Sequence, residues 1–141
     1  MTPIFFTDRD LGKSVPTLLR AAGVSVEAFG DHFTPTATDV EWLPSVGRRG
    51  WYILTHDQRM QYRADEQTAI LNAGLGVFIL IGKVSHRALA ENVIATMPVI
   101  ERFLQHHPRP FIARVYRPTI PTIHPTYLPK PGRVALWRGG G

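Results

Sequence analysis

Short apolar segments alternate with segments of helical periodicity, and this alternation limits the possible folds more than any other feature of the chain. The strand candidates lie at residues 4–7, 24–29, 51–55, 76–81 and 111–116. The fourth of them, G-V-F-I-L-I, contains no polar side chain, which is typical of a strand buried on both faces. Alternating strands and helices predict a three-layer α/β sandwich around a mainly parallel sheet.

Capping residues mark the ends of the predicted helices, which we place at residues 15–22, 40–46, 65–73 and 86–105. Asp39 and Ser85 precede helical segments and belong to the residue types that cap helix N-termini. Gly23 and Gly47 follow the last apolar positions of the first two helices. Glycine readily adopts the left-handed conformation that ends a helix, so we expect both helices to end there.

The chain divides into a compact part and a C-terminal part of different composition. We predict one α/β domain over residues 1–117 and a proline-rich basic tail over residues 118–141. Five prolines lie within 14 residues of this tail, a spacing that favours extended chain. Residues 134–137 could form one small strand docked on the domain, or a loose end.

Charge is distributed unevenly along the chain. The formal net charge is +5, from 16 basic and 11 acidic residues. Residues 102–141 hold seven of the basic residues and no acidic one, which leaves nine basic and 11 acidic residues, a balance of −2, in the first 101. Such a basic segment could bind RNA through phosphate contacts and stacking. It could equally wrap a partner protein or a second subunit.

The composition excludes several classes of protein. The chain has no cysteine, which excludes disulfides, thiolate metal sites and cysteine nucleophiles. No window approaches 18 consecutive apolar residues, so we predict no membrane span. The N-terminus lacks the basic start and the continuous apolar stretch of a signal peptide. We therefore expect a cytoplasmic protein.

Acidic side chains lie where a parallel sheet would bring them to one edge. Asp8 ends the first strand candidate, Asp57 follows Thr55 at the end of the third, and Asp39 and Glu41 open the second helix. Ligands of α/β folds bind at the carboxyl ends of the strands, and carboxylate oxygens are preferred ligands of Mg²⁺ and Mn²⁺. The pattern predicts a divalent-metal pocket, although each aspartate alone could be a helix cap or a turn residue.

Three stretches together resemble a known family. F-F-T-D-R-D-L-G, T-D-V-E-W-L and Y-I-L-T-H-D-Q-R-M are similar in order and spacing to the PIN-like domains, particularly the branch that contains VapC-type toxin ribonucleases. The resemblance covers about residues 3–83. It implies a PIN-like fold and a Mg²⁺- or Mn²⁺-dependent endoribonuclease, in which metal ions activate a water for attack on a phosphodiester.

The resemblance also implies roles for particular residues. Asp8, Asp39 and Asp57 would be the catalytic metal carboxylates, and the Thr55 hydroxyl would orient the site. PIN nucleases usually carry a fourth acidic residue after the third strand, and the nearest ones here are Asp65 and Glu66. Asp10, Asp31 or Glu41 could take its place.

The expected partners follow from the same resemblance. They are an RNA substrate, a cognate antitoxin that blocks the acidic pocket, and a second copy of the chain in a homodimer. Arg9, Arg59 and Arg63 could hold RNA phosphates near the metals, or could instead be ion-pair partners of the acidic cluster. The alternative function is a catalytically silent PIN-like module that binds RNA or protein.

Overall fold

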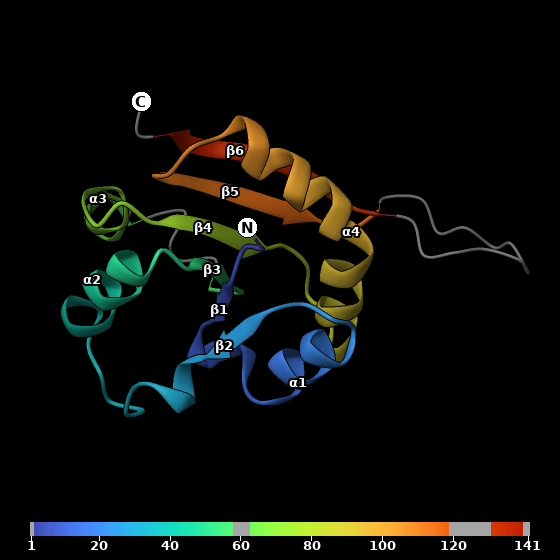
Figure 1. Ribbon diagram of the computed structural model, residues 1–141, viewed down its shortest axis with the longest axis horizontal. Helices are drawn as coiled ribbons and strands as arrows, with labels where there is room; N and C mark the ends of the chain where they lie inside the picture. Colours follow the sequence, from blue (N-terminus) through green and yellow to red (C-terminus); the bar gives the residue numbers. More distant parts are fainter. Residues whose placement is uncertain (1, 58–62, 119–130, 140–141) are drawn as a thin grey trace, which may run out of the picture.

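The computed structural model describes residues 2–57, 63–118 and 131–139. The described residues form one six-stranded sheet in the order β2-β1-β3-β4-β5-β6 (Figure 1). The strands are β1 (Phe5–Thr7), β2 (Val26–Ala28), β3 (Tyr52–Thr55), β4 (Gly76–Leu80), β5 (Phe111–Tyr116) and β6 (Arg133–Gly139). The helices are α1 (Ser14–Ala21), α2 (Asp39–Arg49), α3 (Ala64–Asn72) and α4 (His86–His106), with short 3₁₀ helices η1 (Arg9–Leu11) and η2 (Phe29–Asp31).

The sheet is parallel from β2 to β5, and β6 alone runs antiparallel to its neighbour β5. Parallel neighbours need a crossover connection, and helices supply it between the successive strands. The three-layer α/β sandwich with a mainly parallel sheet that the sequence predicts is therefore confirmed.

Two hydrophobic cores lie on the two faces of the sheet. Phe5, Leu54 and Phe78 belong to the core that contains residues of α1 and α4. Phe6, Ile53 and Val77, their immediate neighbours in sequence, belong to the core that contains residues of α2 and α3. Successive strand residues point to opposite faces, so a strand between two helical layers must be apolar at every position. This requirement explains the uninterrupted apolar run of β4.

The bounds of α2 correct two predictions. Thr38, not Asp39, is the N-cap: the backbone N–H of Thr38 donates to Glu41 Oε2 at 3.2 Å in a capping box that places Asp39 in the first turn. The helix also continues past Gly47 and ends at Gly50, whose φ is +73°. Gly47 is required for close packing instead, because a Cβ there would lie 2.5 Å from the backbone oxygen of Ala73.

Other boundaries differ by a few residues. β2 covers only 26–28 of the predicted 24–29, because Phe29 already begins η2. α1 and α3 are each shifted by one residue, α4 ends one residue later than predicted, and Ser85 caps α4 by accepting a hydrogen bond from the Ala88 N–H at 3.1 Å. None of the helices in the described part of the chain combines the length and apolar character needed to cross a bilayer.

The end of the predicted tail is part of the sheet. Residues 133–139 pair with β5 along its whole length, from Tyr116↔Arg133 to Phe111↔Gly139. Of the two alternatives for this segment, the docked strand is correct, and it is longer than residues 134–137. Most of the proline-rich stretch, residues 119–130, lies outside the described residues.

Replacing Gly47 by alanine tests the packing of α2. Helix propensity alone would stabilise α2 by up to about 1 kcal/mol. We expect Gly47→Ala to lower the free energy of unfolding by about 1–3 kcal/mol, because the added methyl meets backbone that cannot move aside cheaply. Urea unfolding measures the difference, with Arg48→Ala on the exposed side of the same helix as control. A more stable Gly47→Ala variant would contradict this packing.

Candidate functional site

The candidate site begins where β1 and β3, neighbours at the centre of the sheet, end side by side. Thr7 pairs with Leu54, and the Asp8 backbone N–H continues the ladder by donating to the Leu54 carbonyl at 3.0 Å. The side chains of Asp8 and Thr55 therefore meet at the carboxyl edge, although 47 residues separate them in sequence. Asp8 is only 6% exposed and Thr55 is fully buried.

The Thr55 hydroxyl joins three segments. Its oxygen lies 3.2 Å from Asp8 Oδ2 and 3.4 Å from Asp10 Oδ2, and it accepts a hydrogen bond from the Asp57 backbone N–H at 3.1 Å. A hydroxyl has one proton to donate, so it can satisfy only one of the two carboxylates at a time. Thr55 therefore lies between the carboxylates of the predicted site, and the orienting role stays a prediction.

Asp10 reaches the same point because η1 turns the chain immediately after β1. Asp8 caps η1 by accepting a hydrogen bond from the Arg9 N–H at 2.7 Å, and the turn directs Asp10 back toward β3. The His56 backbone N–H donates to Asp10 Oδ2 at 2.9 Å. The other carboxylate oxygen, Oδ1, is buried and has no hydrogen-bond partner among the described residues. A buried, unpaired oxygen is costly unless a ligand satisfies it.

Burial and like charge perturb both carboxyls. Burial, followed by the charge of Asp10, raises the pKa of Asp8 to about 6. Burial also raises the pKa of Asp10, and the charge of Asp57 raises it further, while the hydrogen bond from His56 opposes the change. Two carboxylates that share one site resist simultaneous ionisation. A cation between them would remove this penalty.

Asp39 is connected to this cluster only indirectly. Its Oδ1 accepts a hydrogen bond from Trp42 Nε1 at 3.0 Å and lies 3.9 Å from Arg9 Nη2. Arg9 extends between the segments, since its guanidinium also donates to the carbonyls of Pro35 and Ala37 at 2.8 and 3.1 Å. In the structure, Asp39 binds protein groups rather than sharing the Thr55 hydroxyl.

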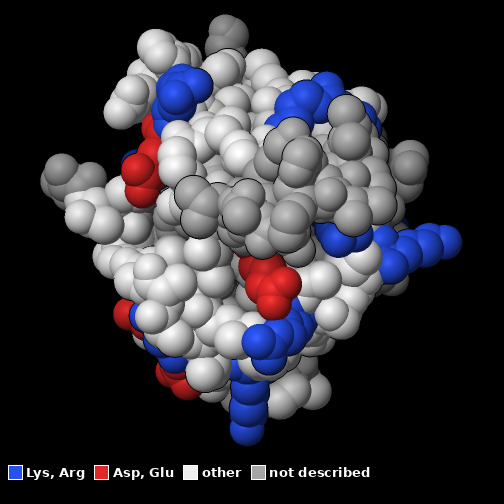
Figure 2. Space-filling model, turned by 90° about the vertical axis from the view of Figure 1, so that its right-hand side faces the viewer, with Lys and Arg blue, Asp and Glu red and all other residues white. Residues whose placement is uncertain are grey.

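Other predicted residues lie apart from the cluster. Glu41 completes the capping box of α2. Arg63 Nη1 lies 3.3 Å from Glu66 Oε1 in an ion pair at the start of α3. Arg59 lies outside the described residues. As in the Arg63–Glu66 pair, acidic groups lie beside basic ones on the face drawn in Figure 2, where red and blue atoms are neighbours and no separate acidic patch is seen.

The donor set fits a divalent cation held by few protein ligands. Among residues 2–57, 63–118 and 131–139, no three His, Asp or Glu side chains are arranged to hold one ion. Asp8 and Asp10, however, present two hard carboxylates within reach of one hydroxyl, and one of the oxygens is unpaired. Mg²⁺ is commonly held by one or two carboxylates, with water and substrate phosphate completing its shell.

The sequence offered Asp10 only as one substitute among several for a fourth acidic residue. Its central position depends on the path of η1 after β1, which brings the Asp10 carboxylate to the Thr55 hydroxyl and the His56 N–H. The ring of His56 was not predicted to have a role. Its Nε2 lies 2.6 Å from the Gly82 carbonyl, which fixes the loop after β3 against the loop after β4.

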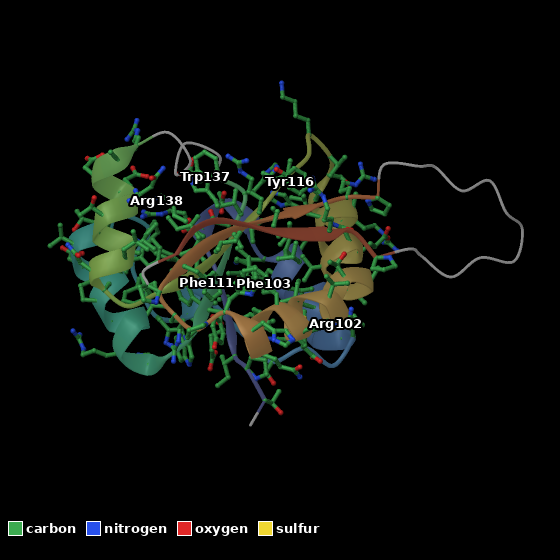
Figure 3. The ribbon with its side chains drawn as sticks, turned by 90° about the horizontal axis from the view of Figure 1, so that it is seen from above. Arg102, Phe103, Phe111, Tyr116, Trp137 and Arg138 are labelled. Atoms are coloured by element: carbon green, nitrogen blue, oxygen red, sulfur yellow. The ribbon has the colours of Figure 1, made fainter. Side chains whose placement is uncertain are left out.

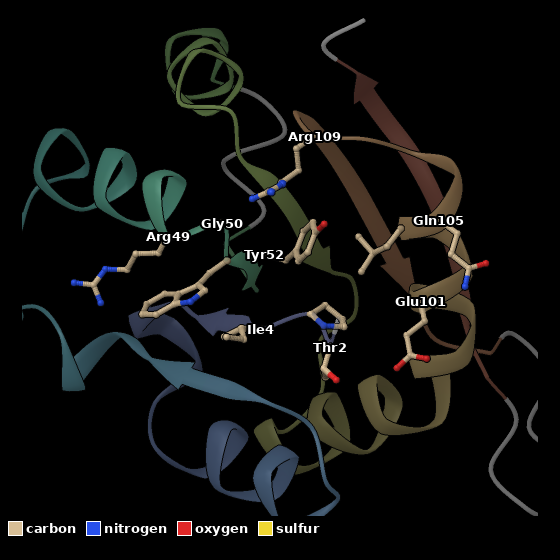
Figure 4. Close-up of a pocket in the computed structure, with 11 residues that line it drawn as sticks. Thr2, Ile4, Arg49, Gly50, Tyr52, Glu101, Gln105 and Arg109 are labelled. Atoms are coloured by element: carbon tan, nitrogen blue, oxygen red, sulfur yellow. The ribbon is translucent and has the colours of Figure 1, made fainter.

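Two surface cavities lie at opposite edges of the sheet. One, of about 530 Å³, adjoins Asp8 and is lined by the basic residues Arg9, Lys13 and Arg20 among others. The other, of about 560 Å³, lies at the amino ends of β1 and β3, where Arg109 lies against Tyr52 and α4 contributes Glu101 and Gln105 (Figure 4). The first of these two cavities adjoins the carboxylate cluster, and the second does not.

The chain is an α/β protein with a mainly parallel sheet and with carboxylates gathered at the ends of β1 and β3. A family model described as "PIN like domain" matches residues 3–82, and the chain belongs to this family. The match extends from β1 past β4 and includes the whole carboxylate cluster. No curated protein and no solved structure matches the chain.

The raised pKa of Asp8 predicts a specific dependence of stability on pH. Because the folded-state pKa, about 6, exceeds the ordinary 3.8, the folded state binds more protons between these values. The free energy of unfolding should therefore fall as pH rises from about 4 to about 6, by an amount on the order of 3 kcal/mol. Urea unfolding across this range, with EDTA present, measures the decline.

Asp8→Asn should remove most of this decline and be more stable than the unaltered protein at pH 7. Asp31→Asn, at an exposed aspartate, is the matched control and should keep it. A full decline in the Asp8→Asn protein would mean that another group carries the effect.

Proposed function

We propose that this protein is a metal-dependent endoribonuclease whose catalytic centre is the cluster of Asp8, Asp10, Thr55 and Asp57. The observation that carries the proposal is the pair of carboxylates, buried Asp8 and half-buried Asp10, on one hydroxyl at the carboxyl edge, with Asp10 Oδ1 unpaired among the described residues. Such a pair is unfavourable without a cation. Membership of the PIN-like family supports the same reading.

Asp8 and Asp10 would hold a Mg²⁺ or Mn²⁺ ion, with Asp57 beside them. The bound ion would supply an activated water and neutralise charge that develops on the phosphodiester. Thr55 donates its one hydroxyl proton to Asp8 or to Asp10, and the His56 backbone N–H donates to Asp10. We infer from the resemblance that Asp39 also contributes, through water or after Arg9 moves onto the substrate.

The adjoining cavity suits the RNA backbone. Lys13 is exposed there, and Arg9 and Arg20 line the same cavity. Basic side chains beside an acidic centre would hold phosphates on either side of the cleaved bond. Arg9 is partly committed to Pro35, Ala37 and Asp39, so Lys13 is the side chain best placed to contact RNA first.

The cleavage test uses a panel of labelled RNAs with Mg²⁺, Mn²⁺ or EDTA. We expect cutting with either metal and none with EDTA. Asp8→Asn and Asp57→Asn should reduce cutting to the EDTA background, because each loses a carboxylate of the site. Glu91→Gln, which changes an exposed carboxylate paired with Arg87 on α4, should cut normally. Metal-dependent cutting by folded Asp8→Asn protein would refute the assignment.

We further propose that the enzyme is the toxin of a toxin–antitoxin pair, acts in the cytoplasm as a homodimer, and is silenced by an antitoxin over the acidic cluster. This part rests on the resemblance to VapC-type proteins. Expression in a bacterial host should arrest growth, and Asp8→Asn should abolish the arrest. Equal arrest by both proteins would contradict the toxin assignment.

A catalytically silent RNA- or protein-binding module is the second candidate. It is favoured by the absence, among the described residues, of three side chains arranged around one metal position. The two candidates differ in the same assay. The module would bind RNA with strong salt dependence and leave it uncut in both metals.

A further inference from the structure

Arginine and aromatic side chains stack on one another across β5 and β6. The Arg114 guanidinium lies over the Trp137 ring at 3.7 Å, and that of Arg133 lies over the Tyr116 ring at 4.4 Å. We call these four residues the β5–β6 strip. Figure 3 shows Trp137 beside Arg138 near α3, with Tyr116 toward the other end of the two strands.

The four side chains share one face of the sheet. Ile112 belongs to the core on the α2 and α3 side, so Arg114 and Tyr116, two and four residues later, point to the same side. Arg133 pairs with Tyr116, and the irregularity between Ile112 and Ala113 brings Trp137 beside Arg114. Arg138 Nη1 donates to Gln67 Oε1 of α3 at 2.7 Å, which places the strip next to α3.

The strip remains accessible to a ligand. Trp137 is 40% exposed, Arg133 is exposed, and Arg114 and Tyr116 are half-buried. In contrast, the other two tryptophans, Trp42 and Trp51, are 1% and 9% exposed and belong to the core. An exposed tryptophan on an edge strand buries little apolar area in the folded chain, so stability alone does not account for it.

The charge of the strip is not neutralised within the described chain. No described carboxylate forms an ion pair with Arg114, Arg133 or Arg138. Arg114 donates to the Tyr116 hydroxyl at 3.4 Å, but its Nε is buried without a hydrogen-bond partner. Stacking covers the face of a guanidinium and leaves N–H groups at its edge for phosphate. In Arg114 these are the N–H groups on the Nη atoms, because Nε is buried.

The strip leads toward the carboxylate cluster. Arg117 follows Tyr116 directly and packs on Gly82, since a Cβ there would lie 3.1 Å from Arg117 Cδ. The Gly82 carbonyl in turn contacts the His56 ring, and the backbone N–H of His56 donates to Asp10. From Arg133 to Trp137 the strand covers about 13 Å at 3.3 Å per residue. A flexible chain on the strip could therefore continue into the site.

We propose that the β5–β6 strip binds single-stranded RNA, with bases stacked on Trp137 and Tyr116 and phosphates on the arginines. Aromatic platforms combined with a basic track are how proteins bind single strands without sequence preference. A second copy of the chain would bring its own basic strip against this one and repel it. The inference rests on the proposed function only in taking RNA as the ligand that reaches the cluster.

The tryptophan distribution makes the binding directly observable. In the Asp8→Asn protein with EDTA, where cleavage cannot interfere, a single-stranded oligouridylate should quench the exposed tryptophan saturably. Trp137→Phe should lose this quenching yet bind labelled RNA within about twofold, because phenylalanine still stacks. Trp137→Ala should bind labelled RNA at least about fivefold more weakly, from the usual loss per stacked base.

A matched pair of arginine variants tests the phosphate contacts. Arg114→Gln should weaken binding and lower the slope of log affinity against log salt by about 0.7, the value for one phosphate on a single strand. Arg109 makes the same kind of stack on Tyr52, at 5.1 Å, but at the opposite edge of the sheet. Arg109→Gln should therefore leave the RNA affinity and its salt slope unchanged. Melting temperatures confirm that each variant is folded.

Unchanged RNA binding by Trp137→Ala and Arg114→Gln would overturn the proposal. The proposal would also be overturned if these two substitutions weakened binding to an acidic protein and left the affinity for RNA intact. The strip would then be a protein interface. Failure of the nuclease assignment is a separate result. If RNA binding depends on the strip but no RNA is cut, only the nuclease assignment is refuted. If RNA is cut and neither Trp137→Ala nor Arg114→Gln changes cutting or binding, only the role of the strip is refuted.

Discussion

Parallel pairing of β1 with β3 brings two distant segments to a common end, and the candidate site depends on this pairing. The register Thr7↔Leu54 places Asp8 beside Thr55. Both strands are covered on two faces, so their registers cannot slip by one residue without exposing a core side chain. The hydrophobic cores thereby fix the carboxylates more firmly than the hydrogen bonds of the site could alone.

The site is an unfavourable arrangement held in place by that packing. Two carboxyls, largely removed from water, share one donor, and burial raises the pKa of each. Perturbed carboxyls of this kind gather at functional sites, where geometry is maintained at a cost in stability. The chain tolerates the cost because Phe6, Ile53, Leu54 and their neighbours bury extensive apolar surface beneath the cluster.

The C-terminal strand forms the edge of the sheet at which we propose that RNA binds. β6 extends the sheet antiparallel beyond β5 and presents arginines stacked on aromatic rings rather than a further apolar face. The acidic body and basic C-terminal part, separated in sequence, become neighbouring surfaces because Arg117 packs on Gly82 near His56. A polyanion could then be held by one surface and reacted at the other.

The layers, the order of the elements and the edge at which acidic residues gather could be predicted from the sequence, because apolar periodicity and strand ends are local properties. The sequence also predicted that Asp8, Thr55 and Asp57 lie at this edge, and the structure brings Asp8, the Thr55 hydroxyl and the Asp57 N–H together there. The sequence could not show that Asp10 shares the Thr55 hydroxyl, that Asp39 binds Trp42 and lies near Arg9, or that Thr38 caps α2. The stacking of Arg114 on Trp137 is likewise seen only in the tertiary structure. These facts depend on contacts between segments distant in sequence and on the path of short turns, neither of which a local pattern encodes.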